Sequence, residues 1–102
     1  MKVFISQSMN GRPDEEVLKE REDVSNRIKW AYSFNDPDKV EILDSWFPDY
    51  EGTGLQFLSK SLMVLAEADL AVFVKGWNTA RGCRLEEAAA NAYGIKCFYM
   101  EL

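Results

Sequence analysis

Four short apolar runs alternate along the chain with stretches whose apolar positions recur every three or four residues. The runs lie at residues 3–5, 40–43, 70–74 and 95–100, and each is typical of a buried β-strand. The stretches between them are typical of amphipathic helices, because residues three or four positions apart share one helix face. The pattern therefore predicts the element order β-α-β-α-β-α-β.

Residues with special backbone preferences mark where the predicted helices begin and end. Pro13 and the three acidic residues after it open the first helix, because proline and carboxylates both favour the amino end. The turn-forming residues 35–38 end this helix. A third, alanine-rich helix is expected over residues 83–93, with Gly94 as its carboxyl cap. Two stripes mark the buried helix faces: Val17, Leu18, Arg21, Val24, Ile28 and Ala31 in the first helix, and Phe57, Leu58, Ser61, Leu62 and Leu65 in the second.

Alternating strands and helices predict a single α/β domain over residues 1–102, in which a four-stranded parallel sheet is covered by helices on both faces. We expect the strand order 2-1-3-4 of a three-layer, Rossmann or flavodoxin-like fold. Ligands of such folds bind beyond the carboxyl ends of the strands, at the switch in strand order. That switch lies between the first and third strands, so we expect the binding site among the loops at residues 6–12, 44–54 and 75–82.

The composition excludes several classes of function. The net charge of −5 argues against nucleic acid as a partner, and the absence of histidine excludes every mechanism based on that side chain. No segment resembles a secretory leader or is apolar enough to cross a membrane, so we expect a cytoplasmic protein with no membrane partner. Cys83 and Cys97 lack metal-ligand spacing, and dinucleotide and Walker A motifs are absent, so no metal or cofactor is predicted.

The first and third loops contain the candidate ligand contacts. Backbone N–H groups of the first loop and the guanidinium of Arg12 could hold an anion, whereas the alternative is a solvated loop with a helix cap. Trp77 in the third loop could stack on a base, or it could anchor the loop or a subunit contact. The first loop supplies these small, polar or cationic candidates: Ser6, Ser8, Asn10, Gly11 and Arg12.

The start of the third helix combines a glycine, two arginines and a glutamate. Gly82 permits a tight turn into the helix, where exposed N–H groups and either Arg81 or Arg84 would attract a phosphate. Glu86 is expected in or near the first turn, where the helix dipole favours an ionised carboxylate that could act as a nucleophile. The alternative is an ordinary first-turn glutamate with no chemical role.

Three segments share a pattern with one enzyme family. They are residues 4–12 (FISQSMNGR), residues 68–74 (ADLAVFV) and residues 82–90 (GCRLEEAAA). They resemble, in turn, the sugar- or base-lining loop, the strand before the catalytic loop, and the Gly-x-x-x-Glu-x-Gly-x-Ala helix start of the nucleoside 2-deoxyribosyltransferases and related deoxynucleoside monophosphate N-glycosidases. The resemblance implies that Glu86 attacks the anomeric carbon, that water or a second base resolves the glycosyl-enzyme, and that the protein is a homo-oligomer.

The chain departs from that family at three positions. Ser61 stands where the family has an aspartate on the second helix, Ala80 where it has aspartate or serine, and Ala88 where it has glycine. Ser61 is included with the substrate-binding candidates, although its hydroxyl cannot act as a carboxylic acid. The resulting prediction is an N-glycosidic-bond hydrolase or deoxyribosyltransferase that acts on a small nucleoside or nucleotide. A nucleotide-binding module without catalysis and an oligomer-forming interaction protein are the alternatives.

Overall fold

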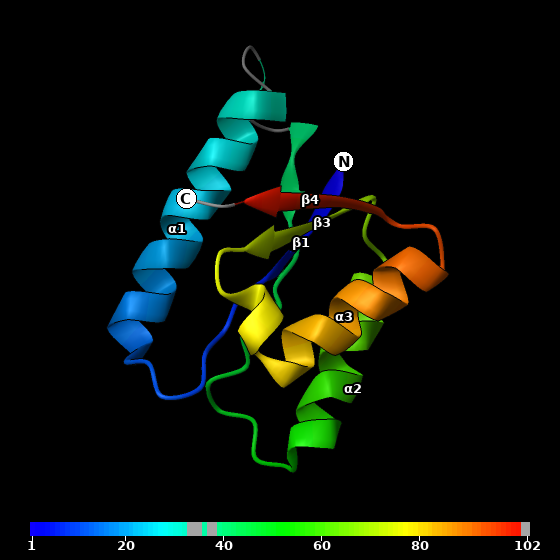
Figure 1. Cartoon of the computed structure of the whole chain (residues 1–102). Coiled ribbons are helices and arrows are strands. Elements are labelled where there is room, and N and C mark those ends of the chain that lie inside the picture. The colour runs from blue at the N-terminus through cyan, green and yellow to red at the C-terminus, as the bar shows by residue number, and fades with distance from the viewer. Residues whose placement is uncertain (33–35, 37–38, 101–102) are drawn as a thin grey trace.

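The computed structural model describes residues 1–32, 36 and 39–100 of the chain. Figure 1 shows the elements in their arrangement, with a short 3-10 helix between β3 and α3. In chain order they are β1 (Lys2–Ser6), α1 (Asp14–Tyr32), β2 (Glu41–Ile42), α2 (Gly54–Leu65), β3 (Leu70–Val74), η2 (Trp77–Thr79), α3 (Arg81–Ala92) and β4 (Lys96–Met100).

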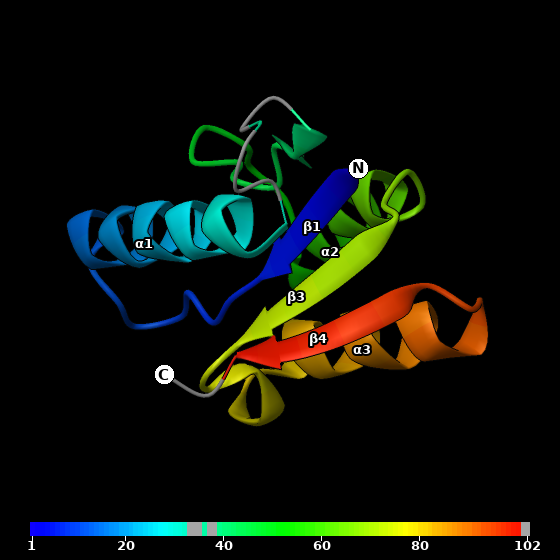
Figure 2. The ribbon, with the colours of Figure 1, turned by 90° about the horizontal axis from the view of Figure 1, so that it is seen from above.

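The four strands form one all-parallel sheet in the order β2-β1-β3-β4, which confirms the predicted α/β fold and strand order. At the centre of the sheet, β1 pairs with β3 from Val3 opposite Leu70 to Ser6 opposite Phe73. Helix α1 lies over one face of the sheet, whereas α2 and α3 cover the other (Figures 1 and 2). Such cover is what a parallel sheet requires, because both of its faces are apolar. The architecture is that of a Rossmann or flavodoxin-like domain.

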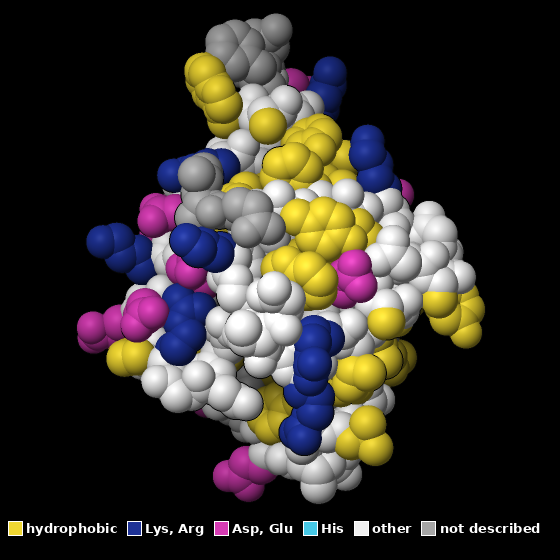
Figure 3. Space-filling model, in the orientation of Figure 1, with side chains coloured by type: hydrophobic (Ala, Val, Ile, Leu, Met, Phe, Trp, Pro, Cys, Tyr) yellow, Lys and Arg dark blue, Asp and Glu magenta, His cyan; other side chains and the backbone are white. Residues whose placement is uncertain are grey.

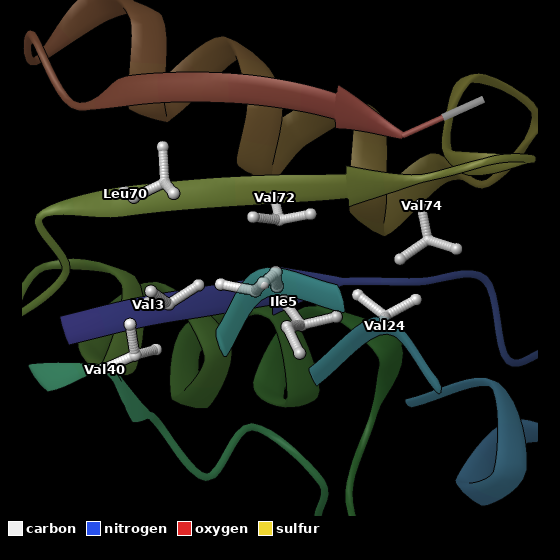
Figure 4. Close-up of a cluster of buried hydrophobic side chains, with 8 residues drawn as sticks. Val3, Ile5, Val24, Val40, Leu70, Val72 and Val74 are labelled. Atoms are coloured by element: carbon white, nitrogen blue, oxygen red, sulfur yellow. The ribbon is translucent and has the colours of Figure 1, made fainter. Parts of the chain in front are cut away.

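Side chains alternate between the two faces along β1 and β3, so the core consists of two hydrophobic clusters. The cluster on the α1 side is drawn in Figure 4 and comprises Val3, Ile5, Val24, Ile28, Val40, Leu70, Val72 and Val74. The cluster on the α2 and α3 side comprises Phe4, Leu65, Ala71, Phe73 and Ala90. Every residue of β3 is buried, which confirms the expectation from its unbroken apolar run.

Local sequence explains how the two helices on the second face are held. Thr53 caps α2: its hydroxyl accepts a hydrogen bond from the Gln56 N–H, and the Gln56 side chain accepts one from the Thr53 N–H. Ala90 on α3 is fully buried, and its small side chain lets that helix lie close to the sheet.

Within the described residues, no helix is both long and apolar enough to span a bilayer.

The structure differs from the sequence prediction in the segment before α3. A loop was expected over residues 75–82, but the chain turns at Gly76 with φ +97°, forms η2, and begins α3 at Arg81 instead of residue 83. A hydrogen bond from the Thr79 hydroxyl to the Gly76 carbonyl oxygen closes the 3-10 turn. Strand β2 is also shorter than predicted. Of the residues predicted to end α1, positions 35, 37 and 38 lie outside the described residues, and the helix ends at Tyr32.

Candidate active site at the carboxyl edge of the sheet

Glu86 is the only charged residue that is buried in the described part of the chain, with 7% of its surface exposed. Its helix, α3, contacts β3, and Ser6 stands at the carboxyl end of β1. The hydroxyl of Ser6 donates a hydrogen bond of 2.7 Å to Oε1 of Glu86. The two strands meet at the switch in strand order, so the carboxylate lies at the edge where α/β folds bind their ligands.

Burial raises the pKa of Glu86 above its ordinary value, because desolvation disfavours the charged form. Hydrogen bonding by Ser6 and Ser61 and the positive charge of Arg21 act in the opposite direction. From the sequence, Glu86 is expected in or near the first turn of the helix, where the dipole would favour ionisation. That expectation is wrong: because α3 begins at Arg81, Glu86 lies in the second turn, and burial dominates its pKa.

We expect Glu86→Gln to stabilise the folded protein at neutral pH. Since the folded-state pKa is raised, the stabilising contribution of Glu86 is fully present below the unfolded pKa and is lost as pH rises through the folded value. Glutamine keeps an oxygen that can accept the bond from Ser6, yet it carries no charge. Urea unfolding should therefore show the stability of the variant rising relative to that of the wild type as the pH is raised above the ordinary pKa of glutamate. A difference in stability that does not change with pH would contradict this account.

A polar network that the sequence analysis missed lies at the same end of β1. Arg21 of α1 donates from Nε to Oε1 of Gln7 and from Nη2 to the hydroxyl of Ser45, each at 2.9 Å. Gln7 and Ser45 are both buried, and Ser45 donates in turn to a backbone carbonyl oxygen of β1. The signal for this network was Arg21 itself, because a cation within an apolar helix stripe requires polar partners.

Arg12, a predicted anion contact, is already paired within its own loop and helix. Its Nη1 donates to the Ser8 carbonyl oxygen at 2.7 Å and to Glu20 at 2.9 Å, while its Nε donates to Glu16 at 3.0 Å. These bonds join the loop after β1 to α1. An anionic ligand would therefore have to compete with two carboxylates for this guanidinium.

The other predicted contacts divide between the site and the surface. Ser61 lies close enough to Glu86 to help lower its pKa, so the structure brings it to the site together with Ser6. Asn10 and Gly11 lie exposed in the loop after β1, and Gly11 adopts φ +74°. These two residues shape the turn but make no hydrogen bond to Glu86 within the described chain.

Trp77, the first residue of η2, packs against two other aromatic rings. Its ring centroid lies 5.5 Å from that of Phe73 and 5.5 Å from that of Tyr99. The indole is half-buried and contacts the hydrophobic cluster on the α3 side. These contacts favour the anchoring role of Trp77 over stacking on a base.

Arg81 and Gly82 are the first residues of α3, and both are exposed. The Nη2 of Arg81 lies 3.3 Å from where a Cβ would stand on Gly54, so its side chain reaches the first residue of α2. In the space-filling view, a hollow opens on this side of the molecule beside lysine or arginine side chains (Figure 3). Within the described residues, Glu86 forms no ion pair with Arg81 or Arg84.

Comparison of the chain with family models, with curated proteins and with solved structures found no match. The Rossmann-like fold is therefore established by the sheet and its helices, and the family resemblance stays a prediction from the motif residues. Among the described residues, no group of three or more histidine, cysteine, aspartate or glutamate side chains could hold a metal ion.

Proposed function

We propose that the protein cleaves or transfers the N-glycosidic bond of a nucleoside or nucleotide, with Glu86 as the nucleophile. The observation that carries the proposal is the burial of this single carboxylate at the switch in strand order, where Ser6 holds one of its oxygens. A sugar bound beyond the ends of β1 and β3 would meet the carboxylate. The likeness of residues 82–90 to the family's helix start adds support from the sequence.

In the proposed reaction, a carboxylate oxygen of Glu86 attacks the anomeric carbon of the sugar. The carbon–nitrogen bond breaks, and its electron pair leaves with the base, which takes a proton from water. The glycosyl ester is then cleaved by water, or a second base displaces Glu86 and receives the sugar. Ser61 occupies the position of the family's acid, but as a hydroxyl it orients the carboxylate instead of protonating the base.

The charge state of Glu86 sets a requirement on this reaction, since only the ionised carboxylate can attack. Burial opposes ionisation, whereas the Ser6 and Ser61 hydroxyls and the charge of Arg21 favour it. These groups give the site a means of keeping a desolvated carboxylate charged. Base release is therefore expected to fall as the pH is lowered through the raised pKa of Glu86.

Nucleotide binding without catalysis is the second candidate function. It is favoured by Ser61 and Ala80, which replace the family's polar or acidic groups, because the leaving base then has no protein acid beside it. An interaction protein is a third alternative, and it would use the apolar side chains of Leu55 and Met63, which are exposed on α2.

Incubation with the common deoxynucleosides and their monophosphates, followed by chromatography, tests the proposal. We expect free base to appear from at least one of these compounds. No release, combined with thermal stabilisation by a nucleotide, would replace the enzyme with the binding module. If no base is released and no nucleotide stabilises the protein, both functions are rejected.

A further inference from the structure

Arg21 differs from Arg12 in the residues that its guanidinium contacts. In the described part of the chain, the ion pairs are those of Arg12 with Glu16 and with Glu20. The hydrogen bonds of Arg21 go instead to the neutral side chains of Gln7 and Ser45. Arg21 is thus a half-buried guanidinium whose charge is not compensated by a carboxylate in direct contact.

Part of this guanidinium is free to meet a ligand. A guanidinium has five N–H donors, and the bonds to Gln7 and Ser45 occupy one on Nε and one on Nη2. Among the described residues, no buried side-chain nitrogen or oxygen lacks a hydrogen-bond partner. Since Nη1 of Arg21 makes no such bond, it must reach solvent-accessible space. Gln7 and Ser45 therefore fix the plane of the group while its other donors stay open.

The open donors belong to the end of the molecule where Glu86 lies. Arg21 and Glu86 influence each other electrostatically, and Asp44, which follows β2, acts on Arg21 in the same way. Burial lowers the pKa of Arg21, but arginine in proteins stays protonated, so the positive charge is permanent. A fixed, planar cation of this kind matches the paired oxygens of a phosphate.

We propose that Arg21 is the residue that binds the phosphate group of a phosphorylated ligand. The nucleoside part of this inference rests on the proposed function of Glu86. In a nucleoside 5′-monophosphate, the sugar separates the phosphate from the anomeric carbon, so one molecule can contact a cation and a nucleophile at the same edge of the sheet. Gln7 and Ser45 are then positioning residues for the anion contact.

Binding measurements on three forms of the full chain test the assignment: the wild type, Arg21→Gln and Arg27→Gln. Arg27 is a matched control, because it is an exposed arginine of the same helix and its removal changes the net charge equally. Calorimetry would compare a deoxynucleoside monophosphate with the corresponding nucleoside. We expect the wild type and Arg27→Gln to bind the monophosphate more tightly by about ten- to one hundred-fold, and Arg21→Gln to lose that preference.

Inorganic phosphate alone provides a second arm that does not depend on the nucleoside. It should raise the thermal unfolding temperature of the wild type and of Arg27→Gln, but not that of Arg21→Gln. Circular dichroism establishes that each variant is folded, and Arg21→Lys, which keeps the charge but loses the fork, should recover part of the effect. If Arg21→Gln fails to fold, Arg21→Lys carries the test, and an unchanged preference for the monophosphate in that variant overturns the fork contact.

The outcomes separate the two proposals. An Arg21-dependent phosphate effect without nucleoside or nucleotide binding would keep the anion site and reject the proposed function. A preference for the monophosphate that persists in Arg21→Gln would overturn the role of Arg21 and leave Glu86 untouched. Equal affinity of the wild type for nucleoside and monophosphate would also overturn it.

Discussion

Replacement of Glu86 by glutamine is expected to reduce base release on the order of 10³-fold or more, because an amide cannot act as the attacking nucleophile. The substitution keeps the shape of the side chain and an oxygen that can accept the 2.7 Å hydrogen bond from Ser6. The loss should therefore appear in kcat, with little change in ligand affinity. Chromatographic measurement of free base under single-turnover conditions gives the rate of the chemical step directly.

Glu87→Gln is the matched control, since it removes the same charge from the next position of α3. Glu87 accepts a hydrogen bond of 2.6 Å from the Tyr99 hydroxyl at the surface, and it takes no part in the proposed site. Its replacement should leave base release within about twofold of the wild type, as expected for surface substitutions away from a site. Because Glu86→Gln should be the more stable protein at neutral pH, unfolding would not explain its inactivity. Full activity in Glu86→Gln would remove Glu86 from the mechanism.

The largest loss of stability is expected from Phe73→Ala, at about 3–5 kcal/mol. Phe73 is fully buried on β3, and its ring packs against those of Trp77 and Tyr99 at centroid distances of 5.5 and 5.7 Å. Truncation removes apolar contacts and leaves a cavity that the surrounding sheet cannot close. Urea unfolding followed by tryptophan fluorescence and by circular dichroism measures the change.

Phe98→Ala tests whether this cost comes from burial and not from the loss of any phenyl ring. Phe98 lies on the neighbouring strand β4, but it is 43% exposed. Its replacement should cost less than about 1 kcal/mol, because nearly half of its surface is already in contact with water. Equal losses for the two variants would contradict the central place given to Phe73 in the core.

The sheet could be predicted from the sequence because its strands have a simple apolar signature. The run Leu70–Val74 is apolar at every position, as expected for a strand that is covered on both faces, and the structure buries all of it. The start of α3 could not be predicted in the same way. It depends on η2, where Trp77 rests on Phe73, and this is a contact between side chains that no local periodicity records.

The candidate residues that lie within a recognisable motif could be predicted from the sequence, whereas contacts between distant segments could not. Glu86 and Ser6 were found from two motifs, but the burial of the carboxylate depends on how α3 packs against the sheet. Arg21 was read as a stripe residue of the first helix. Its partners Gln7 and Ser45 lie 14 and 24 positions away, so their convergence follows from the fold alone.

The central pairing of β1 with β3 has a consequence for how the chain is made. Residues that meet there are far apart in sequence: the Lys2 N–H donates to a carboxylate oxygen of Asp69, across 67 positions. A ribosome therefore releases β1 long before the strand that completes its hydrogen bonds exists. Pairing over such a separation is slow, and in the interval the apolar residues of β1 are open to neighbouring nascent chains.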